Sequence, residues 1–137
     1  MKMSDSRLKV MLVDDEYLTR ELLRRCINWN EIGMEIVSEA SNAYEALDIV
    51  DKIIPDIIIT DICMPFMDGI EFSKAVIERH PHIKIVILTG YEEFEYAKRS
   101  IKVGAADFLL KPINHNEIKK AALNIKEKIE AERTRND

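Results

Sequence analysis

Apolar residues along the chain follow two patterns that alternate with each other. Short, nearly continuous apolar runs lie at residues 8–13, 34–40, 56–60, 83–88 and 106–110. Between these runs, apolar residues recur at helical spacing, in segments 16–28, 43–50, 70–79, 92–103 and 114–129. Continuous runs are typical of strands buried on both faces, and helical spacing is typical of amphipathic helices. The sequence therefore predicts five strands that alternate with five helices.

This alternation is typical of an α/β domain in which helices cover both faces of a parallel sheet. Right-handed crossovers leave few ways of ordering the strands of such a sheet. The leading candidate is the flavodoxin-like, doubly wound (βα)5 fold with the strand order 2-1-3-4-5. We expect the domain to span residues 8–129. The charged segment 130–137 is expected to fray as a tail or to begin a linker.

The composition agrees with one soluble domain of this kind. The chain has 137 residues, of which 47% are hydrophobic and 33% are charged. It holds no apolar run long enough for a membrane span and no apolar core of a signal peptide. Cys26 and Cys63 lie far apart in the sequence, so we expect free thiols and a cytoplasmic location. The net charge of −5 argues against nucleic-acid binding by this chain.

The central apolar run and the residue that ends it are the most informative stretch. Ile57, Ile58 and Ile59 are uninterrupted, and Asp61 follows closely after them. A buried parallel strand delivers such a residue to the carboxyl edge of the sheet, where α/β folds bind ligands. A carboxylate there is poorly solvated, so some other group has to compensate its charge.

Three further strands end in chemically distinctive residues. Asp14 and Asp15 follow the first strand, Thr89 ends the fourth, and Lys111 follows the fifth. In the expected strand order, the first and third strands are neighbours about 4.8 Å apart, so their carboxylates converge with Asp61. Three carboxylates this close repel one another unless a cation intervenes, and oxygen ligands with room for water suit Mg²⁺.

Together these groups describe a site for a phosphoryl group. Mg²⁺, the Lys111 ammonium and the Thr89 hydroxyl can hold an anion, and the small Gly90 leaves space for it. Asp61 is then the natural nucleophile, as carboxylates are in aspartyl-phosphate chemistry. Each residue alone has a plainer reading, since a single aspartate after a strand is more often a turn or a helix cap. The combination at four strand ends is what predicts the site.

Four motifs carry a resemblance to a known family. They are Leu12-Val-Asp-Asp-Glu16, Ile59-Thr-Asp-Ile-Cys-Met-Pro65 with Asp68-Gly69, Leu88-Thr-Gly90 and Leu110-Lys-Pro112. Over roughly residues 8–129, the chain resembles the receiver domain of two-component response regulators. The resemblance implies the same fold and strand order. It also implies a signalling phosphoacceptor and not an enzyme, because such a domain assists only its own phosphorylation and dephosphorylation.

The resemblance implies a role for each residue of the acidic edge. Asp61 is expected to accept a phosphoryl group from a histidine kinase. Asp15, Asp61 and the carbonyl of Cys63 are expected to bind Mg²⁺, with Asp14 assisting through water.

The resemblance also implies a conformational switch. Thr89 and Lys111 are expected to contact the phosphoryl oxygens, and Phe108 falls on the aromatic position that responds to phosphorylation. The switch reshapes the surface made by the fourth helix, the fifth strand and the last helix. Lys111-Pro112 is expected to be a cis peptide, because Lys111 has to point back into the site as the chain reverses.

Two segments narrow the resemblance to receivers that carry an AraC-type helix-turn-helix domain. They are Leu88-Thr-Gly-Tyr-Glu-Glu-Phe-Glu-Tyr-Ala97 and Ile27-Asn-Trp-Asn-Glu-Ile-Gly33. This reading implies a transcriptional output domain absent from this chain, through which alone DNA is bound, and a phosphorylation-dependent homodimer. The alternative is a stand-alone receiver that acts by docking on another protein.

Three rival functions remain for comparison. A phosphatase of the haloacid dehalogenase type needs a second aspartate two residues after the nucleophile, where this chain has Cys63. A flavin or nucleotide module needs phosphate donors after the first strand, where Asp14 and Asp15 repel phosphate. A degenerate receiver that serves only in protein interaction would lack part of the acidic site, and all its positions are filled here.

Overall fold

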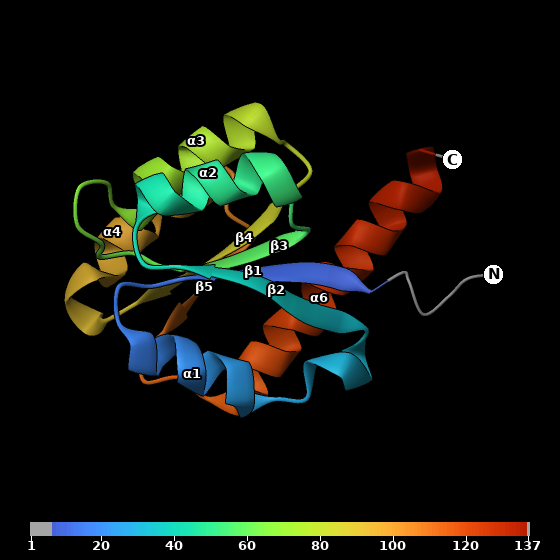
Figure 1. The fold of residues 1–137 in the computed structure, drawn as a ribbon, viewed down its shortest axis with the longest axis horizontal. Helices are drawn as coiled ribbons and strands as arrows, with labels where there is room; N and C mark the ends of the chain where they lie inside the picture. The colour runs from blue at the N-terminus through green and yellow to red at the C-terminus, as the bar shows by residue number, and fades with distance from the viewer. Residues whose placement is uncertain (1–6, 137) are drawn as a thin grey trace.

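Five parallel strands form the central sheet of the structure, a computed structural model that describes residues 7–136 (Figure 1). They are β1 (Leu8–Val13), β2 (Met34–Ala40), β3 (Ile57–Asp61), β4 (Lys84–Thr89) and β5 (Asp107–Leu110). Their order across the sheet is β2-β1-β3-β4-β5, as predicted. The three strands with the most continuous apolar runs, β1, β3 and β4, therefore occupy the middle of the sheet, where both faces are covered.

The helices and short helical turns connect these strands. They are α1 (Tyr17–Cys26), α2 (Ala43–Ile53), α3 (Gly69–Arg79), α4 (Phe94–Ala97), α5 (Arg99–Lys102) and α6 (His115–Asn136), with 3₁₀ turns η2 (Trp29–Ile32) and η3 (Tyr91–Glu93). Figure 1 shows α2 and α3 above the sheet and α1 and α6 below it. Asn42 and Asn114 accept hydrogen bonds from the backbone at the starts of α2 and α6 and cap these helices.

The core lies in two layers, one on each face of the sheet. Along β1, Met11 and Val13 face the layer under α2 and α3, while Val10 and Leu12 face the layer over α1 and α6. This alternation is the period of a β-strand. Trp29 of η2 is buried in the second layer.

The strand register brings the ends of β1 and β3 level with each other. Val13 pairs with Thr60, so the next residues, Asp14 and Asp61, leave the sheet side by side. On the other side of β3, Asp61 pairs with Leu88, one residue before Thr89. The sheet therefore delivers the acidic residues and Thr89 to one edge, because parallel strands share the direction of their carboxyl ends.

One predicted helix is interrupted. The segment expected to be helical over residues 92–103 consists of η3, α4 and α5. The amide of Lys98 bonds to Phe94, four residues back, whereas the amide of Ile101 bonds to Lys98, three residues back. Aromatic and β-branched residues are frequent in this segment and have weak helix propensity. The backbone hydrogen bonds therefore change from a four-residue to a three-residue spacing, and the helix is interrupted.

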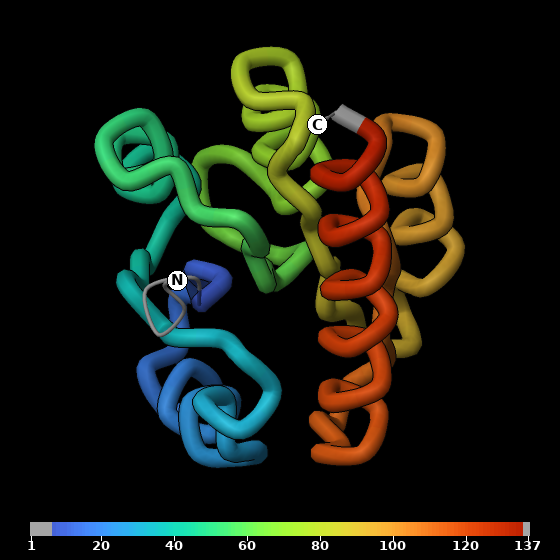
Figure 2. The backbone as a smooth tube through the Cα atoms, turned by 90° about the vertical axis from the view of Figure 1, so that its right-hand side faces the viewer, coloured from blue at the N-terminus to red at the C-terminus, as the bar shows by residue number. Residues whose placement is uncertain are grey.

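The last helix continues past residue 129, where the domain was expected to end. The segment from Glu130, expected either to fray or to begin a linker, is helical through Asn136. Its Glu132 binds Lys84 at 2.6 Å and its Arg133 binds Asp56 at 2.7 Å. Figure 2 shows this end of α6 beside the turn that precedes β4. These ion pairs explain why the helix continues beyond its buried contacts. Within residues 7–136, no helix has the length and apolarity needed to cross a membrane.

Candidate functional site

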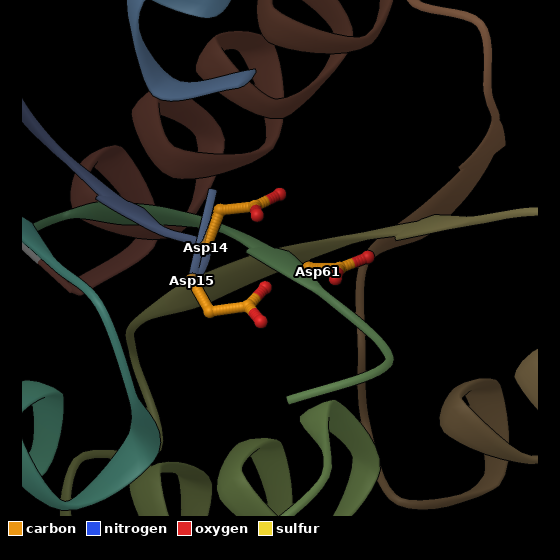
Figure 3. Close-up of side chains that lie close together, drawn as sticks. All are labelled: Asp14, Asp15 and Asp61. Carbon is orange, nitrogen blue, oxygen red and sulfur yellow. The ribbon is translucent and has the colours of Figure 1, made fainter. Parts of the chain in front are cut away.

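Three carboxylates meet at the carboxyl edge of the sheet. Asp14 and Asp15 follow β1 and Asp61 ends β3, and Figure 3 shows their side chains next to one another. One carboxylate oxygen from each lies within 4.8 Å of those of the other two. The structure thus brings together the three acidic residues that the sequence predicted.

Asp14 is the most constrained of the three. Its side chain is buried, and its Oδ1 accepts a hydrogen bond of 2.9 Å from the amide of Glu16. Its Oδ2 is also buried, but no group within residues 7–136 donates a hydrogen bond to it. Burial first, and then the charge of Asp61, raise the pKa of Asp14 to about 6. A buried carboxylate oxygen without a donor is a ready ligand for a cation.

Lys111 supplies the positive charge of the site. Its Nζ lies 3.0 Å from Oδ1 of Asp61 and 3.7 Å from Oδ2 of Asp14. Burial raises the pKa of Asp61 and the Lys111 contact lowers it, with a net rise. Burial lowers the pKa of Lys111, but its pairing with Asp61 outweighs burial and the pKa lies above its usual value. The peptide bond from Lys111 to Pro112 is cis, as expected.

Thr89 lies beside Lys111 at the end of β4. The Lys111 amide donates a hydrogen bond of 2.8 Å to the Thr89 carbonyl, which ties the two strand ends together. The Thr89 side chain is buried, and its hydroxyl donates to the carbonyl of Gly90 at 3.0 Å. A threonine hydroxyl rotates freely between partners, so this donor is available for an anion at the same edge.

The loop after Asp61 passes close over the strand end. The amide of Gly69 donates to the Ile62 carbonyl at 2.8 Å, and a β-carbon at Gly69 would lie only 2.4 Å from the Asp61 carbonyl oxygen. Only glycine permits this approach of backbone to backbone. Cys63 is exposed in the same loop. The Asp61–Gly69 spacing therefore fixes how the loop folds back over the site.

The segment after β4 contacts this loop through side chains. The Tyr96 hydroxyl donates to Oδ2 of Asp68 at 2.5 Å, while Oδ1 of Asp68 caps the start of α3. Phe108 is half-buried on β5 and packs edge-on against Phe94, with ring centroids 5.5 Å apart. No local signal in the sequence identifies the contact of Tyr96, because its partner Asp68 lies 28 residues away.

Arg20 is a second residue that the sequence pattern did not single out. It lies on α1 among the polar positions of the helix, yet its guanidinium reaches back to the Asp14 carbonyl at 2.6 Å. The sequence signal that could have identified Arg20 is its place about one and a half helical turns after Asp14 and Asp15, on the helix face that lies towards the end of β1.

The acidic edge fits a divalent cation that prefers oxygen ligands. Three carboxylates converge, one of their oxygens is buried without a hydrogen-bond donor, and a single lysine cannot neutralise all three charges. Such a donor set, with Asp15 exposed to water, is typical of Mg²⁺ sites that keep several water ligands.

Comparison with known proteins gives a consistent result. Residues 10–123 match the model of the response regulator receiver domain. Among curated proteins, the chain is 38% identical over 110 residues to the uncharacterized transcriptional regulatory protein YesN of Bacillus subtilis, covering 80% of this chain and 30% of that protein. It is 34% identical over 110 residues to the transcriptional regulatory protein HptR of Staphylococcus aureus, covering 80% and 43%.

Solved structures show the same similarity in three dimensions. The REC domain of AraT, a response regulator from Geobacillus stearothermophilus, superposes with a TM-score of 0.87 at 38% identity, covering 92% of this chain and 98% of that one. A two-component transcriptional regulator AraC from Clostridium phytofermentans gives 0.83 at 34% identity, covering 89% and 95%. The chain spans less than half the length of the curated relatives named here.

Proposed function

This chain belongs to the response regulator receiver domains of two-component systems, and on that premise we propose that Asp61 is its phosphoacceptor. The observation that carries the proposal is the pairing of Asp61 with Lys111 inside a cluster of three carboxylates. Asp61 sits at the end of a central strand, where the chain is well fixed. A phosphoacceptor carboxylate has to be held in place by the fold and has to be accessible to the phosphoryl donor.

The chemistry is a phosphoryl transfer from a histidine kinase. A carboxylate oxygen of Asp61 forms a bond to phosphorus while the bond from phosphorus to the donor imidazole nitrogen breaks. The electron pair of the broken bond returns to that imidazole. Lys111 and the Thr89 hydroxyl then hold the oxygens of the transferred group, because both can donate hydrogen bonds from the same edge.

We infer that Mg²⁺ is the cofactor, held by Asp15, Asp61 and the Cys63 carbonyl, with Asp14 assisting through water. When bound, Mg²⁺ neutralises the charge that accumulates on the phosphoryl oxygens. The contribution of this chain is to place the carboxylates before the donor arrives. The buried, donor-free oxygen of Asp14 supports this assignment.

The same site supports a switch through Thr89 and Phe108. Movement of the Thr89 hydroxyl towards the phosphoryl group vacates space near β5, which Phe108 can enter. Phe108 already contacts the segment after β4 through Phe94, so its movement alters the surface of α4, β5 and α6. A ligand shifts such an equilibrium only by its differential affinity for the two states.

The output we propose is transcriptional. Residues 8–129 form the receiver, and the helix beyond Glu130 begins a connection to a DNA-binding domain outside this chain. The relatives YesN and HptR, both longer than this chain, are described as transcriptional regulatory proteins. DNA is then bound only through that domain, in the cytoplasm. A stand-alone receiver that docks on another protein is the alternative, and the reading frame of the gene distinguishes the two.

Acetyl phosphate labelling tests the proposal without knowledge of the kinase. With Mg²⁺ present, intact mass should show the gain of one phosphoryl group on the parent chain and no gain on Asp61→Asn. Removal of Mg²⁺ by EDTA should also prevent the gain. Equal labelling of the parent chain and Asp61→Asn would assign the phosphoacceptor elsewhere.

A further inference from the structure

We propose that Arg20 is the positioning residue of the acidic edge, and that it sets Mg²⁺ affinity by fixing the peptide that joins Asp14 to Asp15. This inference rests on the proposed function, because it concerns the same metal site. Arg20 does not contact the metal or the phosphoryl group. It acts through the Asp14 carbonyl, which it binds at 2.6 Å from six residues further along the chain.

Arg20 is itself held on two sides. Its Nε donates to Oε1 of Glu39 at 2.9 Å, and its guanidinium lies over the ring of Tyr17, 5.6 Å from the centroid. Only 15% of the Arg20 side chain is exposed. Glu39 lies in β2, next to Ala40, so the guanidinium is anchored to the sheet as well as to α1. A planar guanidinium with several hydrogen bonds is held in one orientation and restrains the groups that it contacts.

The Asp14 carbonyl lies just past the end of β1, beyond the hydrogen bonds of the sheet. The Asp14 amide still bonds to the Ala40 carbonyl at 3.1 Å, but Asp14 lies one residue beyond the end of β1. Asp14 is fully buried, so its carbonyl needs an internal donor. Arg20 is that donor, and the bond restrains the rotation of the peptide leading to Asp15.

Asp15 depends on this restraint more than the other two carboxylates do. Lys111 pairs with Asp14 and Asp61, and the ion pairs of residues 7–136 include none to Asp15. Nor does a side-chain cap fix the start of α1, within the part of the chain that the structure describes. The direction of the Asp15 carboxylate therefore depends on the two peptides that flank it. Arg20 holds the first through the Asp14 carbonyl, and the Asp14 side chain holds the second through the Glu16 amide.

The charge of Arg20 and its positioning role predict opposite effects on Mg²⁺. A positive charge near a cation site repels the cation, so its removal should strengthen Mg²⁺ binding if charge alone mattered. Loss of the hydrogen bond from Arg20 to the Asp14 carbonyl lets the Asp15 carboxylate move away from the position that the metal needs, which weakens Mg²⁺ binding. The sign of the change in affinity therefore separates the two accounts.

Arg24 provides a matched control on the same helix. It binds the other oxygen of Glu39 and carries the same charge, but it is 43% exposed and has no hydrogen bond to Asp14. Arg20→Met and Arg24→Met make the same chemical change one turn apart. Both methionines retain an apolar stem over the helix surface.

Isothermal titration of the unphosphorylated chain with Mg²⁺ is the test. We expect Arg20→Met to weaken Mg²⁺ binding about tenfold, the order seen when residues that orient metal ligands are removed, and Arg24→Met to leave it nearly unchanged. In an Asp15→Asn background, the Arg20→Met change should have little further effect, because the two act through one ligand. If Arg20→Met does not fold, Arg20→Lys keeps the charge but lacks the planar guanidinium whose separate nitrogens reach Glu39 and Asp14, and it too should weaken binding.

Unchanged or stronger Mg²⁺ binding by the folded Arg20 variant would overturn the inference while leaving the phosphoacceptor proposal intact. Equal weakening by Arg20→Met and Arg24→Met would overturn it as well, because the effect would then be general to charge on α1. Failure of the parent chain itself to bind Mg²⁺ would instead contradict the proposed metal site, and the positioning role with it.

Discussion

The position of Asp14 in the acidic edge lowers the stability of the folded chain. Its carboxylate is buried beside Asp61, and burial is the main reason that its pKa rises to about 6. The folded chain therefore retains the Asp14 proton at pH values where the unfolded chain has lost it. The resulting cost to folding is absent below the ordinary aspartate pKa, grows as the pH rises, and is complete above about 6.

Asp14→Asn should therefore stabilise the chain at neutral pH when Mg²⁺ is absent. The pKa rises by about two units, from 3.8 to about 6, and one unit corresponds to about 1.4 kcal/mol, so we expect the free energy of unfolding to rise by about 3 kcal/mol. The gain should disappear in acid, below the ordinary aspartate pKa. Urea denaturation at both pH values measures it.

Added Mg²⁺ provides the counterpart to that measurement. On the proposed metal site, Mg²⁺ should raise the melting temperature of the parent chain, since a ligand that binds only the folded state stabilises it, and it should raise that of Asp14→Asn much less. A variant that is less stable than the parent at neutral pH without Mg²⁺ would show that Asp14 already has its charge compensated within the chain.

The sequence identifies these carboxylates but not the residues that hold them. Asp14, Asp15 and Asp61 could be predicted because a strand end fixes where a residue emerges, and strands are recognisable from local pattern. Arg20 and Tyr96 could not, because each reaches its partner through side-chain direction. That direction depends on how the helices are packed and not on spacing along the chain.

At the scale of elements, one hydrogen bond joins the segment after β4 to the loop after β3. Tyr96 donates to Asp68, and Asp68 also caps α3 through its other oxygen. The hydrogen bond to Asp68 is the main cause that raises the pKa of Tyr96 to about 12. The neutral phenol therefore stabilises the folded chain below the ordinary tyrosine pKa, and this contribution is lost as the pH rises through about 12.

Tyr96→Phe should lower the free energy of unfolding by about 1 kcal/mol at neutral pH, the usual net worth of one hydrogen bond. Ultraviolet titration should show a late phenol ionisation, near pH 12, in the parent chain but not in the variant. Tyr91, which is 83% exposed, offers the matched control Tyr91→Phe, with little expected effect on stability. Retention of the late ionisation in Tyr96→Phe would assign it to another tyrosine.

Local composition explains one of the two segments whose helix bounds were hard to predict, and tertiary contacts explain the other. The segment 92–103 has the apolar spacing of one helix, but its hydrogen-bond ladder tightens at Ile101 and splits it. The end of α6 has the composition of a frayed tail, but Lys84 and Asp56, both distant in sequence, bind it to the amino edge of the sheet. Local propensity decides such segments only when no tertiary contact competes.

At the scale of the whole molecule, the fold was predictable because its strands and helices alternate without exception. Parallel strands with right-handed crossovers leave few arrangements, and the one expected is the one observed. The register of β1 on β3 then makes the acidic edge a consequence of the topology. Topology does not determine which surface of the molecule contacts a partner.

Phosphorylation should promote pairing of two copies through the surface of α4, α5, β5 and α6. Exposed apolar residues lie in this region, with Ile101 on α5 at 48% and Leu123 on α6 at 39% exposure. Sedimentation velocity should show a monomer before acetyl phosphate treatment and a dimer after it, and Asp61→Asn should remain monomeric. A fully phosphorylated chain that stays monomeric would favour the stand-alone receiver that docks on a different protein.

In the proposed mechanism Asp61 alone carries the phosphoryl group, and the position of the label in the chain tests this directly. Borohydride reduction converts a phosphorylated aspartate to homoserine, which peptide mass spectrometry locates. After treatment with acetyl phosphate and Mg²⁺, we expect homoserine at residue 61 and at no other aspartate. Homoserine at residue 14 or 15, or a labelled chain with no homoserine at residue 61, would contradict the account.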